Sequence, residues 1–387
     1  MRLAVVLISE QTVPNVVWLE DTKSEWDKIL FVSTSRMEGK DGKKKSKSRI
    51  ILDAIGEPPH DVLIVNQEMI FDVGQKLKEY FDNNSFDRVI VNVTGGTKIM
   101  SLATYTFFQG KKDVEIWYLP IGSSVYKRIY PLGEDGRAVD RSVGFRLDVE
   151  RYFKSIGVEI ESIGEPLNIE IARRIMDKYF EKRRSVKRLT EILKEYRGRR
   201  KKRVKIKRSD DWVKVSEYMK EFKLNAEEFD FGEKDWASFF SGGWFEEFVY
   251  DEMQKLKDSG CIDDVRLNLK IKTKESEESE MSNELDVVFT KDNNLYVVEC
   301  KSGDLSVSVM TNEVFYKTAY LNKTFGLSAK SFIAYLGRNG ERDVEDSERD
   351  QLEKRAPVFG LEVIFADDIR EKGIRAIFED RLCKNQK

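Results

Sequence analysis

Short runs of consecutive apolar residues recur through the first third of the chain, and each has the length of a buried strand. The runs are LAVVLIS at 3–9, KILFVSTS at 28–35, DVLIVN at 61–66, RVIVNVT at 88–94 and VEIWYLPIG at 114–122. Helical patterns lie between several of them, and this alternation is typical of an open α/β sheet. The pattern predicts a Rossmann-like domain, which binds ligands beyond the carboxyl ends of its strands.

A different pattern occupies residues 283–303, NELDVVFTKDNNLYVVECKSG, where two largely apolar segments flank Asp292-Asn293-Asn294. Asp and Asn tolerate positive φ, so the segment predicts a β-hairpin with Asp292 and Asn293 at its turn. Counting outward from that turn gives the pairs Lys291–Asn294, Val288–Val297, Asp286–Glu299 and Glu284–Lys301. Because opposed side chains share a face, the last two pairs are predicted to project from one side of the hairpin.

Glu284, Asp286, Glu299 and Lys301 suggest a chemistry. Three carboxylates within a few ångströms repel one another and are costly to bury without a cation. Oxygen ligands without His or Cys favour Mg²⁺ or Mn²⁺ over zinc, and the Lys301 ammonium can stabilise a developing phosphorane or help deprotonate a water. The cluster predicts metal-dependent phosphodiester hydrolysis. A solvated surface hairpin is the alternative, but LYVVECK is apolar on both faces, as in a buried central strand.

A helical pattern lies upstream at 241–256, SGGWFEEFVYDEMQKL, and makes Glu246 and Glu247 available to face the strands. The order of a helix Glu, a strand Asp and then Glu-x-Lys resembles the PD-(D/E)xK restriction-endonuclease-like superfamily. The segments GGWFEEFV, NELDVVF and LYVVECKSG are similar to its branch fused to CRISPR-associated sensor domains.

This resemblance implies that Asp286, Glu299 and Glu246 are the metal ligands and that Lys301 is the catalytic lysine. Glu247 stays open as the helix acid, because only the spacing from Trp244 favours its neighbour. Leu285 stands where the superfamily usually has Pro. The full candidate catalytic set is Glu246, Glu284, Asp286, Glu299 and Lys301.

The strand pattern at 88–94 leads into Thr94-Gly95-Gly96-Thr97-Lys98, where a helix is predicted to begin. Free backbone N–H groups and the positive helix end would lie near an anion there. The segment matches neither the P-loop nor the dinucleotide-binding glycine pattern. A tight strand-to-helix turn that requires positive φ explains it equally well.

VNVTGGTKIMSLA, at 91–103, looks like the signature of CARF domains, the sensors of CRISPR-linked cyclic oligoadenylates. The resemblance implies that the activator binds across the two-fold axis of a homodimer, with cyclic tetra-adenylate as the first expectation and cyclic hexa-adenylate as the second. It also implies ligand contacts at Ser9, Thr12, Thr34, Thr94, Gly95, Gly96, Thr97 and Lys98.

The length of 387 residues exceeds the size of one core, so several domains are expected. We expect a sensor domain at 1–148, a small helical or winged-helix-like linker at 149–231 and an α/β nuclease domain at 232–387. Residues 181–208 hold fifteen Lys or Arg and three Glu. This run is either a solvated helix face or a basic surface that attracts nucleic acid. The acidic segment 274–282 is predicted to be an exposed loop.

The cysteines, the apolar start of the chain and the single histidine limit the expected compartment and chemistry. Cys261, Cys300 and Cys383 are an odd number without metal-type spacing, which points to a reducing cytoplasm rather than a disulfide framework. The apolar start of the chain is too short to span a bilayer, so no membrane is expected. His60 is the single histidine, which disfavours serine-hydrolase and zinc chemistry.

Together these patterns and resemblances predict a homodimeric nuclease of type III CRISPR defence, gated by a cyclic oligoadenylate. Single-stranded DNA and RNA are the first expected substrates, and nicking of supercoiled duplex DNA follows. Trp236, Phe239 and Trp244 either stack on bases or belong to the core. Two alternatives remain: a ligand-responsive nucleic-acid-binding regulator without catalysis, and a ring nuclease that degrades the cyclic oligoadenylate.

Overall fold

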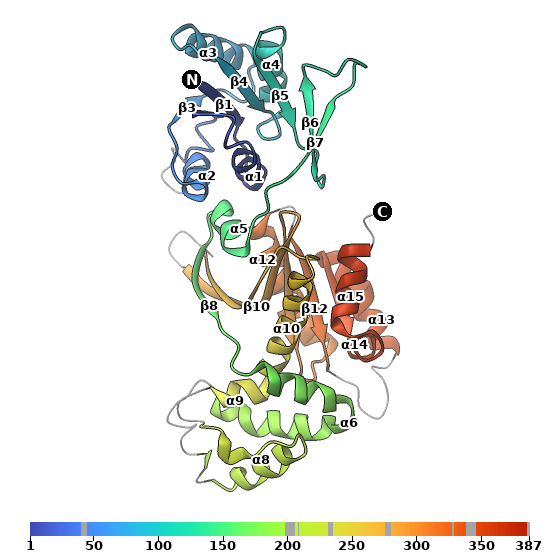
Figure 1. Ribbon diagram of the computed structural model, residues 1–387. Coiled ribbons are helices and arrows are strands. Elements are labelled where there is room, and N and C mark those ends of the chain that lie inside the picture. The colour runs from blue at the N-terminus through green and yellow to red at the C-terminus, as the bar shows by residue number, and fades with distance from the viewer. Residues whose placement is uncertain are drawn as a thin grey trace.

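The computed structural model has three stacked parts, which Figure 1 shows from top to bottom: a first sheet with its helices, a second sheet, and a group of helices beneath it. It describes residues 1–39, 45–197, 206–207, 209–230, 235–274, 280–326, 329–337 and 346–384. Much of the basic run 181–208 and of the acidic segment 274–282 therefore lies outside the described residues.

The first sheet has the strand order β3-β2-β1-β4-β5-β6-β7. Its strands are β1 (Arg2–Leu7), β2 (Lys28–Ser33), β3 (His60–Ile64), β4 (Arg88–Asn92), β5 (Val114–Tyr118), β6 (Val125–Tyr130) and β7 (Val139–Ser142). Strands β1 to β5 are parallel and the last two are antiparallel. All five apolar runs are strands, so the predicted Rossmann-like fold is confirmed.

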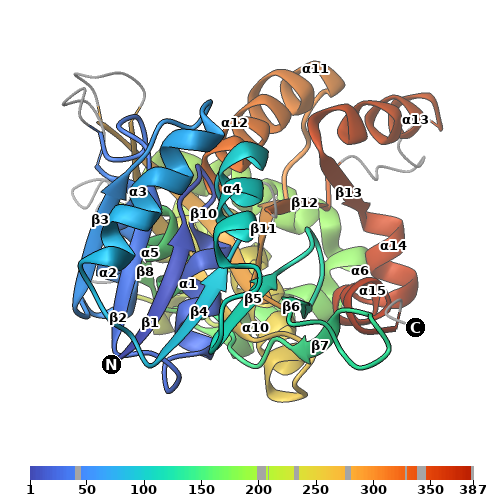
Figure 2. The same ribbon diagram turned by 90° about the horizontal axis from the view of Figure 1, so that it is seen from above.

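Helices cover both faces of this sheet. They are α1 (Val13–Asp21), α2 (Lys47–Ile55), α3 (Ile70–Asp82) and α4 (Lys98–Phe108). Leu77 of α3 and Met100 of α4 pack on one face, whereas Leu19 of α1 and Ile51 of α2 pack on the other. Figure 2, viewed from above, shows α3 and α4 as the outer layer. Helices α1 and α2 therefore face the rest of the molecule.

The second sheet has the order β13-β12-β11-β10-β9-β8. Its strands are β8 (Glu159–Gly164), β9 (Asp264–Lys274), β10 (Glu280–Lys291), β11 (Asn294–Lys301), β12 (Lys330–Tyr335) and β13 (Leu361–Phe365). Strand β11 pairs with β10 on one side and β12 on the other, and most of its side chains are buried. LYVVECK is thus a central strand, as its apolar pattern predicted.

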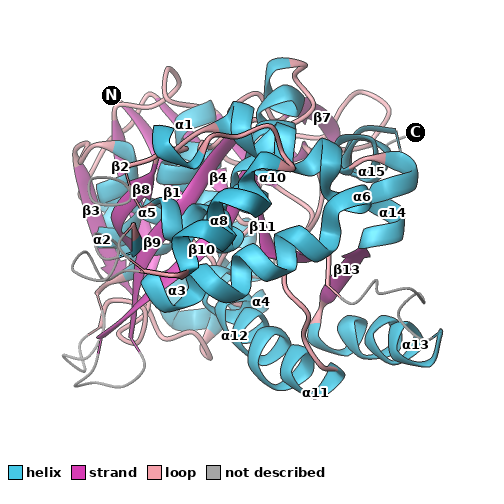
Figure 3. Ribbon diagram, turned by 90° about the horizontal axis from the view of Figure 1, so that it is seen from below, coloured by secondary structure: helices cyan, strands magenta, loops and turns pink. Residues whose placement is uncertain are grey.

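Helices enclose the second sheet from below and from the side. They are α6 (Ile169–Leu193), η1 (Lys194–Tyr196), α8 (Asp211–Lys220), η2 (Ala226–Glu228), α9 (Trp236–Ser238), η3 (Phe239–Gly243), α10 (Trp244–Asp258), α11 (Val307–Val309), η4 (Met310–Phe315), α12 (Tyr316–Phe325), α13 (Asp346–Arg355), η5 (Ala356–Phe359), α14 (Ala366–Lys372), α15 (Ile374–Glu379) and η6 (Asp380–Lys384). Figure 3, from below, shows α6 and α8 in front of this sheet.

The expected linker has no core of its own. One apolar cluster runs from α6 and α8 through α10 to the lower face of the second sheet. Strand β8 adds to the edge of that sheet. Over its described residues, the segment 169–230 is helical and contains no β-hairpin. Of the two expected forms of the linker, helical and winged-helix-like, the structure therefore has the helical one. Trp236, Phe239 and Trp244 are buried in this cluster and therefore belong to the core.

Helix α5 (Val149–Ile156) joins the two sheets (Figure 1). Its first turn is capped by Asp148, whose side chain accepts a hydrogen bond from the Arg151 N–H at 2.7 Å. Tyr152 and Phe153 are buried in a cluster that contains residues of α1 and α2 together with the upper face of the second sheet. The Tyr152 hydroxyl also donates to the carbonyl of Phe325 at 3.1 Å. One continuous core therefore links the two sheets.

Cys261 and Cys383 form a disulfide whose Cα atoms lie 6.0 Å apart. The expectation against disulfides is therefore wrong for this pair. The two residues are 122 positions apart, and only the packing of η6 beside the start of β9 brings them together. Cys300 is free and buried. No helix in the described ranges has the length and apolar content that a membrane crossing requires.

Replacing Phe153 by Ala tests whether α5 holds the sheets together. Phe153 is fully buried and packs edge-on against Phe325 at 5.3 Å. The cavity should lower the free energy of unfolding by about 3–5 kcal/mol, measured by urea denaturation. Lys154→Ala, at an exposed position of the same helix, should change it by less than about 0.5 kcal/mol. Equal effects of the two variants would contradict the role of α5.

Candidate active site and ligand pocket

The hairpin formed by β10 and β11 has the predicted turn. Asp292 and Asn293 both have positive φ, 50° and 63°, as a two-residue turn of this kind requires. The strands then pair in register from Lys291–Asn294 to Val287–Val298. The predicted pairs Asp286–Glu299 and Glu284–Lys301 lie beyond this ladder, so the hairpin register holds for five pairs and ends at the charged residues.

The ladder ends because the chain is irregular around Asp286. Opposite it on β9, Asn268 has a φ of 47°, and the pairing of β10 with β9 skips these two residues. Leu285 and Val287, which would share a face of a regular strand, belong to different apolar clusters. The Asp286 carboxylate instead accepts a hydrogen bond from the Cys300 N–H at 2.7 Å. This bond fixes Asp286 beside the end of β11.

Asp286, Glu299 and Lys301 form a compact charge cluster. The Lys301 ammonium lies 2.6 Å from a Glu299 oxygen and 3.7 Å from an Asp286 oxygen. Asp286 and Glu299 are buried, and burial together with the Glu299 and Glu246 carboxylates raises the pKa of Asp286 well above its usual range. Burial lowers the pKa of Lys301, but Asp286 and Glu299 outweigh it, so this pKa is raised. The lysine is therefore a cation in this cluster.

The two acids of α10, Glu246 and Glu247, have different surroundings. Burial raises the pKa of Glu246 to about 7, Lys301 opposes the shift, and Glu284 and Glu299 add to it. Glu246 is therefore close to the cluster. Glu247 points elsewhere, since its two oxygens accept the N–H groups of Leu167 and Asn168 at 2.6 and 2.8 Å. It thereby satisfies free donors at the start of α6.

Glu284 lies at the margin of this group. Its side chain is half-exposed and pairs with Lys270 of β9 at 3.9 Å. The charge of Glu284 still contributes to the raised pKa of Glu246. Of the five candidate catalytic residues, the structure therefore gathers four closely and leaves Glu284 beside them.

Two neighbours of the cluster were not among the predicted residues. Asn268 hydrogen-bonds Glu246, and its own Oδ1 is buried without a hydrogen-bond partner. Arg197 reaches the same region from the chain beyond α6, where its guanidinium donates to the hydroxyl and carbonyl of Ser241. In the sequence, the only signal for Asn268 is that an Asn interrupts an otherwise alternating strand. No local pattern indicates Arg197.

The cluster has the donor chemistry of a hard cation site. The side chains of Asp286, Glu299 and Glu246 offer only oxygen atoms as ligands. These three carboxyl groups lie beside a single ammonium group, that of Lys301. Such ligands suit Mg²⁺ or Mn²⁺. Within the described residues, no three His, Cys, Asp or Glu side chains are already arranged to hold a metal ion directly. The residue types therefore fit the predicted metal, while Lys301 supplies the counter-charge in this arrangement.

A cavity of about 700 Å³ lies where the first sheet meets the second. Strands β1 and β4 are neighbours in the first sheet, and the strand order reverses between them. Ligands of open α/β sheets bind at such a point. The lining residues are Ser9, Gln11, Val13, Pro14, Asn15, Val17, Thr94, Gly95, Leu119, Pro120, Ile121, Gly122, Ser123, Ser124, Val143, Arg146, Tyr152, Asp292, Asn293, Asn294 and Tyr296.

Three of the eight predicted ligand contacts line this cavity, namely Ser9, Thr94 and Gly95. The other five have different surroundings. Thr12 is buried and donates to the carbonyl of Ser155, and Thr34 accepts from the Met37 N–H. Thr97 caps α4 by accepting from the Met100 N–H, Lys98 is exposed at the start of that helix, and Gly96 packs beside Leu7.

The two glycines satisfy the tight-turn interpretation. A Cβ on Gly95 would lie 2.2 Å from the carbonyl oxygen of Leu7, which is a severe clash. Gly96 has a φ of 75°, which favours glycine. The turn therefore needs both glycines whether or not an anion binds to it.

Some of the remaining lining residues were not connected with ligand binding by the sequence pattern. Arg146 lies in the segment before α5, and Asp292, Asn293 and Tyr296 belong to the hairpin of the second sheet. The pocket is thus shared between the two sheets. No local pattern could indicate this, because the contacts span about 150 residues of sequence.

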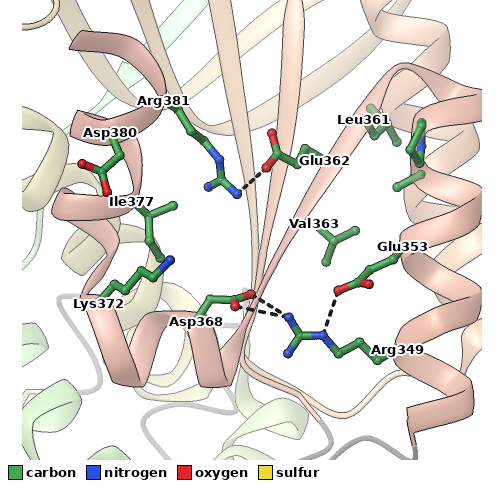
Figure 4. A pocket seen from close by; sticks show the side chains of 12 residues that line it. Arg349, Glu353, Leu361, Glu362, Val363, Asp368, Lys372, Ile377, Asp380 and Arg381 are labelled. Carbon is green, nitrogen blue, oxygen red and sulfur yellow. Dashed lines mark hydrogen bonds and ion pairs between the residues drawn. The ribbon is translucent and has the colours of Figure 1, made fainter. Parts of the chain in front are cut away.

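A second cavity, of about 410 Å³, lies between α13, β13 and the C-terminal helices (Figure 4). Arg349 binds Glu353 at 2.8 Å and Asp368 at 3.2 Å, and Arg381 pairs with Glu362. These opposite charges neutralise one another across the cavity. The Arg349–Asp368 pair joins α13 to α14, and the Arg381–Glu362 pair joins η6 to β13, so these side chains have a structural role.

Family models match both ends of the chain. The model described as the Card1 CARF domain matches residues 3–152, and the one described as the Card1-like endonuclease domain matches residues 233–378. Comparison with curated proteins gave no significant match.

Solved structures share the whole architecture. Protein VC1899 from Vibrio cholerae matches with a TM-score of 0.76 at 18% identity, over 98% of both chains. Can2 from Sulfobacillus thermosulfidooxidans, in complex with cyclic tetra-adenylate, matches with a TM-score of 0.70 at 20% identity, over 98% of this chain and 99% of its own. A type III CRISPR defence DNA nuclease activated by cyclic oligoadenylate has a TM-score of 0.50 at 15% identity, over 91% of this chain and 51% of its own.

Substituting Gln for each acid of α10 should separate their roles. Glu247→Gln loses one of two backbone acceptors and should lower the free energy of unfolding by about 1–3 kcal/mol. Glu246→Gln should leave it equal to or above the wild-type value at pH 8 without metal, because the raised pKa means that folding disfavours the charged carboxylate. Urea denaturation measures both, and a larger loss for Glu246→Gln would refute the assignment.

Proposed function

The chain combines a Card1 CARF domain with a Card1-like endonuclease domain, and from this premise we propose that it is a metal-dependent nuclease of type III CRISPR antiviral defence, activated by a cyclic oligoadenylate. The observation that carries this proposal is the cluster of Asp286, Glu299 and Lys301 at the end of one hairpin, with Glu246 beside it. The opposite end of the same hairpin lines the pocket of the first sheet.

In this proposal Asp286, Glu299 and Glu246 hold the metal ion. A bound Mg²⁺ or Mn²⁺ would polarise the phosphodiester and activate water. Asp286 is held for this purpose by the Cys300 N–H, and Asn268 orients Glu246. A Glu299 oxygen lies 2.6 Å from the Lys301 ammonium.

Lys301 acts as a fixed positive charge. Burial lowers its pKa, but the Asp286 and Glu299 carboxylates outweigh burial and raise it above the ordinary value. An ammonium in this position stabilises the additional negative charge that develops on a phosphate under attack. Charge stabilisation is the role that we propose for this lysine.

The pocket of the first sheet is the proposed site of the cyclic oligoadenylate. Its position at the point where the strand order reverses, and its lining by Ser9, Thr94 and Gly95, support this assignment. Cyclic tetra-adenylate is the first candidate, since Can2, which shares this fold, is described in complex with it. Cyclic hexa-adenylate is the second. Thr12, Thr34, Gly96, Thr97 and Lys98 remain proposed contacts that would require an altered pocket or a second protomer.

A homodimer is proposed because the outer layer of the first sheet carries exposed apolar side chains. Phe71 at the start of α3 is 88% exposed and Leu102 of α4 is 61% exposed. The two helix starts are neighbours, since Thr97 donates to the carbonyl of Gln67 at 3.2 Å. A second copy of this face would cover the patch and place Lys98 close to the symmetry axis.

Single-stranded DNA and RNA are the first proposed substrates, with nicking of supercoiled DNA next. Basic side chains of α6 lie close to the cluster, where Lys187 and Arg183 pair with Asp304, three residues after Lys301. Such a surface attracts phosphate without sequence preference. The basic run thus supports a nucleic acid as the substrate.

Cleavage assays test the proposed activity. Labelled single-stranded DNA, RNA and supercoiled plasmid are incubated with Mg²⁺ or Mn²⁺, with and without each cyclic oligoadenylate. Cutting should depend on metal and activator, and Glu299→Ala should reduce it by roughly 100-fold or more. Glu371→Ala, an exposed acid of α14, is the matched control and should cut like wild type. Activator binding without cutting under any condition would favour a regulator instead.

The dimer is tested by Phe71→Asp. A charge in the apolar patch should convert the dimer to a monomer in sedimentation or light scattering, and should weaken activation. Val358→Asp, at an equally exposed apolar position of η5 in the second half of the chain, should leave the mass unchanged. A wild-type monomer at all concentrations, with the activator present, would rule the dimer out.

A further inference from the structure

The turn of the catalytic hairpin forms one wall of the proposed ligand pocket. Asp292, Asn293, Asn294 and Tyr296 of the second sheet line the same 700 Å³ cavity as Ser9 and Thr94 of the first. The two ends of one hairpin thus lie at the two sites on which the proposed function depends.

The turn is bound firmly to the segment that leaves the first sheet. The Asn293 side chain donates to the carbonyl of Phe145 at 2.9 Å and accepts the Leu147 N–H at 2.8 Å. On its other side, the Asp292 N–H donates to Asp263 at 2.7 Å. A shift of the segment 145–147 would therefore move the turn with it.

The hairpin between the turn and the cluster is a stiff element. Five consecutive residue pairs join its strands, and Val287, Val288, Val297 and Val298 are almost completely buried on both of its faces. At about 3.4 Å per residue, the five steps along the strand from Asn294 to Glu299 span roughly 17 Å. Close-packed elements of this kind move as units, so a displacement of the turn reaches Glu299 and Lys301.

Arg146 and Asp292 are the charged residues among those described as lining the pocket, and they bind each other. The Arg146 guanidinium is anchored by the carbonyl of Val143 at 2.7 Å and lies 3.3 Å from one Asp292 oxygen. The other Asp292 oxygen is 3.3 Å from Lys291. A phosphate entering the pocket would be repelled by Asp292 and attracted by Arg146, and guanidinium groups bind phosphate in bidentate fashion.

We propose that Arg146 exchanges the Asp292 carboxylate for a phosphate of the bound ligand, and that Asn293 passes the movement of the segment 145–147 to the catalytic hairpin. Lys291 retains Asp292 after the exchange, and Asp263, which lies 4.0 Å from Arg146, keeps its hydrogen bond from the Asp292 N–H. This coupling rests on the proposed function, because it assumes an anionic activator and a nuclease site. It assigns Arg146 as a ligand-binding residue and Asn293 as a positioning residue that acts through the hairpin.

Two variants test the coupling with cyclic tetra-adenylate as the probe. Asp292→Asn removes the competing charge but retains a residue that tolerates positive φ. It should lower the activator concentration for half-maximal cleavage by about 5-fold or more. Asn293→Gly keeps the turn backbone and removes both side-chain bonds. At an activator concentration that calorimetry shows to saturate the variant, the ratio of cleavage rates with and without activator should fall by about 5-fold or more.

Glu150→Gln is the matched control. It breaks an ion pair with Arg266, 3.1 Å long, between α5 and β9, without touching the pocket. It should change neither the activator dependence nor the activation ratio. Thermal unfolding verifies that all three variants are folded, and calorimetry measures binding separately from cleavage.

The results of these experiments show separately whether the proposed function fails and whether the proposed coupling fails. If the wild-type protein binds no cyclic oligoadenylate or cleaves equally without one, the proposed function fails. If wild type is activated and both variants match it in half-maximal concentration and activation ratio, the coupling is wrong while the function stands. Equal changes in Glu150→Gln would likewise overturn it, because they would show a general effect of weakening the interface.

Discussion

The ammonium of Lys301 is the contact on which the second half of the molecule depends. It lies 2.6 Å from Glu299 and 3.7 Å from Asp286, and without it two buried carboxylates would lie close together without a neighbouring cation. The Cys300 N–H adds a hydrogen bond to Asp286. These contacts are possible only because the β10–β11 ladder ends before the charged residues, which frees one backbone donor for a side chain.

The second constraint is the core that continues through α5. Since Tyr152 and Phe153 pack between α1 and α2 above and the second sheet below, the two sheets cannot shift without disturbing buried apolar contacts. The hairpin turn lies at the edge of this core, where polar bonds to 145–147 replace apolar packing. Hydrogen bonds and an ion pair exchange partners more readily than a packed core does, which makes this edge the place where a ligand can act.

Some residues of the candidate active site could be predicted from the sequence, whereas others could not. Asp286, Glu299 and Lys301 were found by counting outward from a turn, since strand parity is local, and the structure brings them together. The same count misplaced Glu284, because the irregularity opposite Asn268 changes the direction of the side chains. In the sequence, only the spacing from Trp244 favours Glu246 over Glu247. Only the neighbouring start of α6, which binds Glu247, distinguishes them.

The sequence by itself determined five strands of the first sheet, the two hairpin strands of the second with their turn, and the glycines of the 94–98 turn, because apolar periodicity and backbone preference act over a few residues. Tertiary structure alone decided that the expected linker shares a core with the second sheet, that Cys261 meets Cys383, and that Arg146 meets Asp292. Each of these contacts joins segments far apart in the chain. A single sequence does not indicate which distant residues will meet, because their positions are decided when the shared core packs.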